Sequence, residues 1–530
     1  MRITATIILA GVLGLCYVLG GCSAKKYKEK ADKQVYDILD KKWDPNFGEK
    51  VNYRVSDVKK GANDINVPLA IPAKGVLTLF EAVQIATAHS REYQDEKERL
   101  YVSALALTGA RHQFEPIFSA GGAADYKNAA GVESVRAAPT AGFSQLLGTG
   151  TAISANIALD WFKFLGSGGP KASFGSVLGA TVEQPLLRGA NPVVVKEGLT
   201  QAERNTLYEI RNFNRFRQTF IIQTVNDYYR VLQALDGVEN AERSYKSLQI
   251  AEERIRMLAD AGRLPYFEVD QASQQTLQVY DSYVQAQQEY ARALDEFKIK
   301  LSLPTVANVT LDPCELKIIS EAAITEPNFT VDEATATAID NRLDLANDLD
   351  QLDDAKRKVI VAKDGLKADL NLKAAATASS ADRKIGDIQF DDGTYAVGAE
   401  LDLPIDRLEE RNAYRASLLT LERQKRSYQH SLDQVVFEVR QSFRDVREAA
   451  ARYEIQKHSR DLAQRRVENV NMLLQAGRDV TTRDLLDAES DLLSAQDALT
   501  AATVNHTIAK LNFYRSVGIL RVRADGMWSY

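Results

Sequence analysis

The sequence is poor in the residues that build metal centres and hydrolytic sites. Its 530 residues include five histidines and three cysteines, and the histidines form neither a His-Glu-x-x-His motif nor a cluster with cysteine. The stretch GSGGPK (residues 166–171) lacks the spacing of a phosphate-binding loop. A net charge of −6 gives no electrostatic support for a nucleic-acid partner. We therefore expect neither an enzyme nor a bound cofactor or metal.

Long apolar runs are absent after the N-terminus, which excludes a transmembrane helix from the mature chain. The N-terminus itself indicates a targeting segment, with Arg2 followed by an apolar core over residues 3–18. The LGGC stretch ending at Cys22 resembles the bacterial lipobox. This resemblance implies a signal peptide over residues 1–21 and lipidation of Cys22, with Ser23 favouring the outer membrane. An ordinary signal peptide with an incidental cysteine is the alternative.

The scarcity of cysteine also excludes an internal disulfide in the mature monomer. Cys16 lies in the segment that would be removed, and Cys22 would carry the lipid. Cys314 then has no partner within the chain, even though such a compartment is oxidising.

The chain contains a long internal repeat. LTLFEAVQIATAHS from Leu77 returns as FTVDEATATAIDNR from Phe329, and LADAGR (258–263) returns as LLQAGR (473–478). Such repeats indicate one structural unit used twice. Thr78 and Thr330 are each followed three residues later by glutamate, a pattern typical of a capping box. We therefore predict a linker (22–76), a first repeat (77–302), a connector (303–328), a second repeat (329–520) and a tail (521–530).

Strands are predicted where glycine is concentrated and apolar residues alternate with small or polar ones. Residues 117–190 hold twelve of the thirty glycines, whereas residues 200–300 hold two. The alternation favours strands of about 9–11 residues, the length of a tilted membrane strand, although a soluble sandwich shows the same pattern. The alternating segments are 118–126, 153–161, 178–183, 370–378 and 395–403.

Proline is absent from two long stretches, between Pro192 and Pro265 and after Pro404. Apolar residues there recur at intervals of three and four, as in coiled coils. This predicts a long helix over about 193–260, return helices over about 265–302 and 481–517, and a matching long helix in the second copy. A helix of roughly 100 Å, at 1.5 Å per residue, cannot bury its apolar stripe alone and needs neighbours.

Together these elements resemble the TolC-like outer-membrane efflux proteins, over about Leu77–Leu520. The resemblance rests on the LTLFEA-type start, QPLLRG (184–189), the AGR turns, LLDAESDLLSAQDAL (485–499) and the two-copy layout. It implies a mostly α protein with membrane β. In that fold a homotrimer gives four strands per chain to one twelve-stranded outer-membrane β-barrel, which continues into a long periplasmic α-helical barrel.

The resemblance also implies the function and the partners. Such proteins are passive exit ducts of tripartite efflux or type I secretion systems, and small-molecule export and protein secretion both fit. They sit in outer-membrane lipid of a Gram-negative-type cell. They dock a periplasmic adaptor (membrane fusion) protein and, through it, an inner-membrane transporter of RND or ABC type. The alternative is a lipid-anchored periplasmic coiled-coil spacer without a pore, which leaves the bilayer-length strands unexplained.

One departure from the family concerns the first strand region, which is roughly twice as long as the second. The extra stretch 141–161, within a longer insertion over 128–170, carries Gly148 and Gly150 as a turn. It indicates either an additional hairpin or a long extracellular loop, so the strand count stays open.

Family members are pinched shut at the periplasmic end by acidic side chains on the inner helix. The matching positions are Asp484 and Asp487, whose spacing places both on one helix face. Threefold symmetry would turn them into acidic rings that favour cations. The alternative is a solvated helix start, where the helix dipole favours acidic residues. Glu268 occupies the corresponding place in the first copy.

The turns between the long helices form the expected tip of the tube. Gly262 and Gly477 suit left-handed helix caps. The resemblance adds adaptor docking at Gly262, Arg263, Leu264, Gly477 and Arg478. The two arginines would hold carboxylates at the tip in the closed state.

Overall fold

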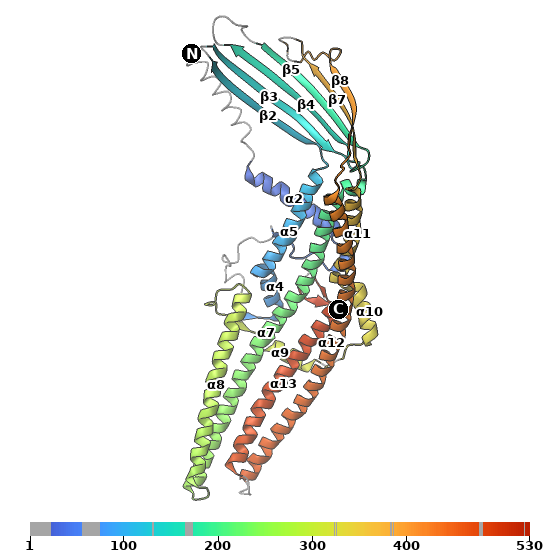
Figure 1. The fold of residues 1–530 in the computed structure, drawn as a ribbon. Coiled ribbons are helices and arrows are strands. Elements are labelled where there is room, and N and C mark those ends of the chain that lie inside the picture. Colours follow the sequence, from blue (N-terminus) through green and yellow to red (C-terminus); the bar gives the residue numbers. More distant parts are fainter. Residues whose placement is uncertain are drawn as a thin grey trace. The chain divides into compact units, whose positions relative to one another are not determined.

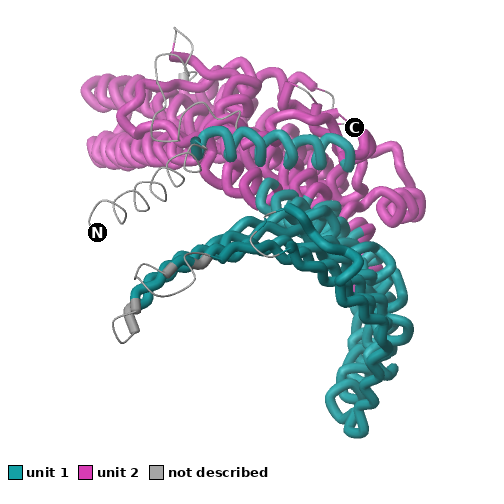
Figure 2. Tube along the Cα trace, turned by 90° about the horizontal axis from the view of Figure 1, so that it is seen from above, with its two compact units in different colours: residues 1–42, 101–209, 347–429 teal, residues 43–100, 210–346, 430–530 magenta. Residues whose placement is uncertain are grey.

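The computed structural model describes residues 23–55, 75–129, 132–164, 173–322, 324, 326–381, 384, 386–475, 481–523 and 525–529. The chain divides into two compact units, coloured separately in Figure 2. Unit 1 comprises residues 1–42, 101–209 and 347–429, and unit 2 comprises residues 43–100, 210–346 and 430–530. Each unit therefore combines segments from both halves of the sequence.

Unit 1 contains a six-stranded antiparallel sheet with the order β2-β3-β4-β5-β7-β8 (Figure 1). The strands are β2 (Ile117–Ala129), β3 (Val132–Leu146), β4 (Ala152–Phe164), β5 (Ser173–Pro185), β7 (Asp369–Ser379) and β8 (Thr394–Asp402). The helices of this unit are α2 (Ala24–Lys42), α6 (Pro192–Val195), most of α5 (Arg91–His112) and most of α11 (Leu343–Asp364). Strands adjacent in the sheet follow one another along the chain, except that β7 joins β5 after a long excursion.

The register gives this sheet one charged face and one apolar face. Residues directly opposite each other on antiparallel strands point to the same side, so the pairs Asp125↔Arg136 and Glu183↔Lys373 belong to one face. On that face Arg136 forms an ion pair with Asp160 (Nη2 to Oδ2, 2.6 Å). Nearly all charged residues of the strands share it; the exceptions, Glu133 and Lys163, lie at strand ends.

Large apolar side chains occupy the opposite face of the same sheet. Alternation from the registered positions places there Phe118, Tyr126, Val135, Phe143, Ile153, Ile157, Leu159, Trp161, Phe174, Leu178, Val182, Leu370, Leu372, Tyr395, Val397 and Leu401. Its aromatic residues cluster near strand ends: Phe118 lies 6.1 Å from Phe143 between ring centroids, and Trp161 is registered opposite Phe174. Among the described residues of this face, Phe118 and Val397 are 81% and 79% exposed, whereas Ser176 and Ala378 are buried.

The five alternating segments predicted as strands are confirmed as β2, β4, β5, β7 and β8. The extra stretch is an additional hairpin: β3 and β4 are joined by a tight turn in which the Leu147 N–H donates to the Thr151 carbonyl (2.8 Å) and Gly150 has φ +85°. The expectation of four strands per chain is therefore wrong, because this hairpin brings the sheet to six.

Unit 2 is mainly helical. It holds α4 (Leu79–His89), α8 (Tyr266–Lys300), α9 (Cys314–Glu321), α10 (Val331–Asn341) and α13 (Thr482–Val517), with the larger part of α7 (Glu197–Asp260) and of α12 (Leu408–Gln475). The small elements are a 3-10 turn η1 (Pro45–Phe47), parallel β1 (Val76–Leu77) and β6 (Thr310–Leu311), and antiparallel β9 (Arg521–Val522) and β10 (Trp528–Ser529).

The long helices agree with the predicted ones to within a few residues at each end, and α7 alone contains 64 residues. Apolar contacts join α7 to its neighbours, for example Leu248 with Val279 of α8 and Leu486 of α13. None of the described helices combines the length and the apolar character needed to span a bilayer.

The helices that open each predicted repeat correspond residue for residue. The bounds of α4 and α10, and those of α5 and α11, are displaced by the same interval that separates Thr78 from Thr330. Both threonines cap their helices in the predicted capping boxes, with Glu81 and Glu333 as reciprocal partners. Local sequence chemistry therefore fixes the same helix start twice.

Candidate functional site

The turn between α7 and α8 is held by backbone hydrogen bonds and a small apolar cluster. Gly262 has φ +71°, and the Arg263 N–H donates to the Leu258 carbonyl (2.8 Å), so the predicted left-handed cap is confirmed. Leu264 packs against Ile255, Ala259, Val269 and Ala272. Arg263 is exposed and forms no ion pair with any residue that the structure describes.

The start of α13 is fixed by a capping box. The Asp484 carboxylate accepts from the N–H (3.0 Å) and the hydroxyl (2.7 Å) of Thr481, and the Asp484 N–H donates back to that hydroxyl (3.3 Å). The Thr481 hydroxyl and N–H, followed by the positive charges of Arg466 and Arg483, hold the pKa of the Asp484 carboxyl below its ordinary value. Asp484 therefore stays ionised and has a structural role at the helix start.

Asp484 and Asp487 are both exposed, as a pore-facing pair requires. Asp487 lies 3.9 Å from the Arg483 guanidinium and is 59% exposed, so the pairing leaves its charge largely open to solvent. The other predicted residues of this region, Gly477 and Arg478, lie outside the described residues, as does the predicted lipidation site Cys22.

Glu268 is placed beside the start of α13. Its carboxylate accepts a hydrogen bond from the Thr482 hydroxyl, and Thr482 is buried with 1% exposure. The first turn of α8 is thereby tied to the first turn of α13, two residues before Asp484. The structure thus brings Glu268 and Asp484 into one region near the turns, which we call the tip contact (Glu268, Thr482 and Asp484).

A line of polar contacts, which we call the α7–α13 seam, continues from the tip contact along the helices. The Ser247 hydroxyl donates to Glu489 (2.7 Å), and the Thr500 hydroxyl donates to Asp236 (2.6 Å). The Asn240 amide donates to Asp497 (2.8 Å). This seam adds hydrogen bonds to the apolar contact between Leu248 and Leu486, and their geometry fixes the relative register of the two helices.

Glu489 is a buried carboxylate of the seam, and the sequence analysis did not identify it. Only 6% of the residue is exposed, and this burial raises the pKa of its carboxyl, although the Ser247 hydrogen bond opposes the shift. The sequence contains a pattern that predicts this burial: Glu489 lies four residues from both Leu485 and Leu493, on the apolar stripe of the helix. A charged residue on an apolar stripe is expected to be buried, and a buried charge either has a hydrogen-bonding partner, serves a function or destabilises the fold.

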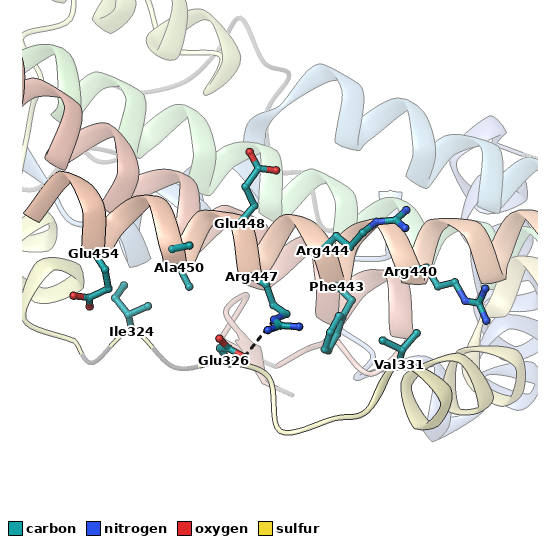
Figure 3. Close-up of a pocket in the computed structure, with 11 residues that line it drawn as sticks. Ile324, Glu326, Val331, Arg440, Phe443, Arg444, Arg447, Glu448, Ala450 and Glu454 are labelled. Atoms are coloured by element: carbon teal, nitrogen blue, oxygen red, sulfur yellow. Dashed lines mark ion pairs between the residues drawn. The ribbon is translucent and has the colours of Figure 1, made fainter.

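A second feature of unit 2 is an open groove of about 730 Å³ beside α12 (Figure 3). Arg440, Arg444 and Arg447 recur along one side of α12, and the Arg447 guanidinium lies 3.7 Å from the Glu326 carboxylate. Glu326, Glu448 and Glu454 balance the three arginines within the lining. The groove therefore offers no net charge by which to select a ligand.

The sequence of the second half matches a known family. Residues 335–519, from α10 to the end of α13, match the family model described as Outer membrane efflux protein. A comparison with curated proteins finds no significant match.

The fold as a whole matches solved outer-membrane channels. OprN superimposes with a TM-score of 0.59 at 16% identity, covering 87% of this chain and 97% of OprN. CmeC of Campylobacter jejuni gives 0.60 at 15% identity, covering 83% and 85%, and MtrE of Neisseria gonorrhoeae gives 0.57 at 13% identity, covering 85% and 90%. OprN, CmeC and MtrE are all outer-membrane channels. The family match over residues 335–519, together with the fold shared with these channels, confirms the resemblance predicted from the sequence.

Proposed function

We propose that this chain is the outer-membrane exit duct of a tripartite efflux or type I secretion system. It would conduct substrate passively, with energy supplied by an inner-membrane transporter of RND or ABC type that connects through a periplasmic adaptor. One observation carries the proposal: a sheet with one charged face and one apolar face occurs in the same chain as helices of 64 and 68 residues.

The sheet suits a membrane barrel because its apolar face is large and continuous and carries highly exposed side chains such as Phe118 and Val397. Outer-membrane barrels present such a face to lipid, with aromatic residues near the strand ends, and keep charged residues toward the lumen. Lys373 illustrates the lumenal side, since it pairs with Glu400 on one neighbouring strand and lies 3.8 Å from Glu183 on the other. A water-filled lumen would solvate these ions, whereas lipid would not.

The proposed assembly is a homotrimer in the outer membrane with a long periplasmic extension. The exposed apolar residues of the long helices support assembly, because in the monomer Ile250, Leu277 and Ile455 are 64%, 66% and 63% exposed to water. Each chain would be anchored by lipid on Cys22 and would use its two repeats (77–302 and 329–520) as equivalent halves of the tube, joined by 303–328 and flanked by 22–76 and 521–530.

The proposed gate lies at the tip contact. Asp484 and Asp487 would form acidic rings at the narrowest point, and Glu268 would hold α8 against α13 in the closed state through Thr482. Two observations support this assignment: Asp487 is 59% exposed, and the lowered pKa of Asp484 keeps that carboxylate charged at neutral pH.

The proposed docking surface for the adaptor comprises the two turns, with Gly262, Arg263 and Leu264 in one and Gly477 and Arg478 in the other. Leu264 is engaged in its own apolar cluster, so Arg263 is the side chain of the first turn that is open to a partner. Binding there would open the duct by favouring one of two tip conformations.

Electron microscopy of the detergent-extracted protein tests the proposal. We expect a threefold particle with a tube well over 100 Å long, as helices of this length allow at 1.5 Å per residue, and a detergent belt at one end. Slender rods without a belt would contradict the proposal and would favour the periplasmic spacer.

A further inference from the structure

Both edges of the six-stranded sheet lack a partner strand within the chain as the structure describes it. β2 pairs only with β3, and β8 pairs only with β7, and every residue of β8 is exposed. An edge strand presents a row of unpaired backbone N–H and C=O groups. Such groups cannot remain unsatisfied in lipid, so a sheet that spans a membrane must close on itself or on another chain.

The two edges are complementary in direction. The six strands alternate in direction, so β2 and β8, at opposite edges, run antiparallel to each other. The β8 edge of one copy can therefore continue into the β2 edge of the next copy as an ordinary antiparallel pair. Head-to-tail contacts of this kind form a closed ring when a rotation axis relates the copies.

The two edges are also complementary in the faces they present. On β8 the charged face holds even-numbered positions such as Glu400, and the apolar face holds odd-numbered positions such as Val397. On β2 the charged face holds odd-numbered positions such as Asp125, and the apolar face holds even-numbered ones such as Phe118. A register that pairs even positions of β8 with odd positions of β2 continues both faces across the junction.

The additional hairpin, β3 and β4, is part of the same continuous sheet. β3 is registered with β2 along its length, and β4 is registered with β5 along most of its length. The turn between them is too tight for a loop that leaves the sheet. Of the charged residues of the hairpin, Arg136 and Asp160 lie on the same face as Glu183 and Lys373, whereas Glu133 and Lys163 lie on the opposite face at strand ends. The hairpin therefore keeps the two-faced pattern of the rest of the sheet.

We infer that neighbouring copies of this chain join β8 to β2, and that the three-copy duct contains eighteen strands. The copy number rests on the function proposed above, and the six strands per copy come from the sheet itself. Barrel diameter grows roughly linearly with strand number, so this barrel is about 1.5 times as wide as a twelve-stranded one. Barrels of about 16–18 strands enclose an aqueous channel, which suits hydrophilic cargo too bulky for the narrower barrel.

Electron microscopy of the full-length protein, at a resolution finer than the strand spacing of about 4.8 Å, tests this inference directly. We expect a threefold wall of eighteen strands with β8 beside β2 of the next copy. A threefold wall of twelve strands with the β3–β4 hairpin outside it would overturn the inference and leave the duct intact. A wall of twelve strands from two copies would overturn the inference too. A particle without a detergent belt would instead contradict the proposed function.

Disulfide trapping gives an independent test of the junction, in a Cys314→Ser background. Ala399→Cys is combined in turn with face-matched Ala120→Cys, Gly122→Cys and Ala124→Cys, and with face-mismatched Gly121→Cys and Ala123→Cys. We expect chain-to-chain disulfides for at least one matched pair and for neither mismatched pair. The registered pair Ala120→Cys/Ala141→Cys is the control and should oxidise within one chain. If that control oxidises while no matched pair links two chains, the β8–β2 junction is refuted.

Discussion

The tip contact leads to a quantitative prediction about gating. Thr482→Val removes the hydroxyl that donates to Glu268 and nearly preserves side-chain volume. A hydrogen bond to a charged group contributes about 1.5–3 kcal/mol. Because Glu268 is only half-buried, water recovers part of this free energy, and we expect a loss of about 1–2 kcal/mol. If opening separates α8 from α13, the equilibrium between closed and open tips then shifts about 5- to 30-fold toward open.

Single-channel recording in planar bilayers measures this shift as the ratio of open to closed times. Thr503→Val is a matched control, because Thr503 lies on the same helix, is buried, and donates only to the Leu499 carbonyl of its own turn (2.9 Å). We expect the Thr503 variant to gate like the parent protein. An unchanged open-to-closed ratio in the Thr482 variant, with normal assembly, would refute the role of this contact in closure.

Three further predictions concern charge. The double variant Asp484→Asn/Asp487→Asn should raise conductance and weaken cation preference in bilayer recordings. Unchanged reversal potentials would count against an acidic gate. Asparagine at position 484 can still accept a hydrogen bond from Thr481, so the helix cap should persist. Arg342→Met should destabilise unit 2 by about 2–3 kcal/mol, which a lower unfolding midpoint would show. The Arg342 side chain is 6% exposed and forms ion pairs with Asp344 (2.6 Å) and Glu438 (2.6 Å). Both carboxylates are partly exposed, so water compensates for part of the lost interaction. Glu489→Gln should raise thermal stability at pH 7 but leave it unchanged below pH 4.5, the ordinary pKa of glutamate. Folding raises the pKa of Glu489, so the parent protein loses stability as the pH rises from 4.5 through the pKa of the folded state, and the glutamine variant does not. A stability difference between variant and parent that is the same at every pH would exclude ionisation of Glu489 as the cause.

The long helices and their starts were predictable because the determining signals are local. Apolar residues at intervals of three and four, uninterrupted by proline, define α7 and α13 within a few residues. Thr78 and Thr330 carry their capping partners three positions on, so the helix starts depend on no distant contact. Five strands likewise follow from alternation within single segments.

β3 was harder to predict because its sequence contradicts strand propensity. The segment AAPTAG (137–142) has small residues and a proline in the strand interior, where the missing N–H breaks a ladder. In the structure Pro139 is registered opposite Gly122 on β2, but neither Ala138 nor Pro139 has a registered partner on β4. Neighbouring strands on both sides therefore impose a conformation that the segment itself does not favour.

The functional assignments depended on pairings that no local pattern encodes. Glu268 was a candidate from its position in the repeat, but its bond to Thr482 joins helices far apart in the sequence. Asp484 lies three residues before Asp487, as expected for a pair on one helix face, but it also lies three residues after Thr481, which makes it a helix-capping residue. One carboxylate therefore has both a structural role and a proposed role in the gate. The burial of Glu489 required knowing which face of α13 lies against α7.

The order of the strands has a consequence for how the protein folds. β2 to β5 form successive hairpins, each of which can close within microseconds of the chain emerging. β5 must then wait for β7, because the Leu178↔Ala378 pairing joins segments separated by α7, α8 and the connector. Closing so long a loop opposes folding only slightly more than closing a short one, by about 0.6 kcal/mol per doubling of loop length. The long separation along the chain nevertheless slows folding. During that delay β5 is an exposed, aggregation-prone edge, so folding should depend on factors that shield it until the second half arrives.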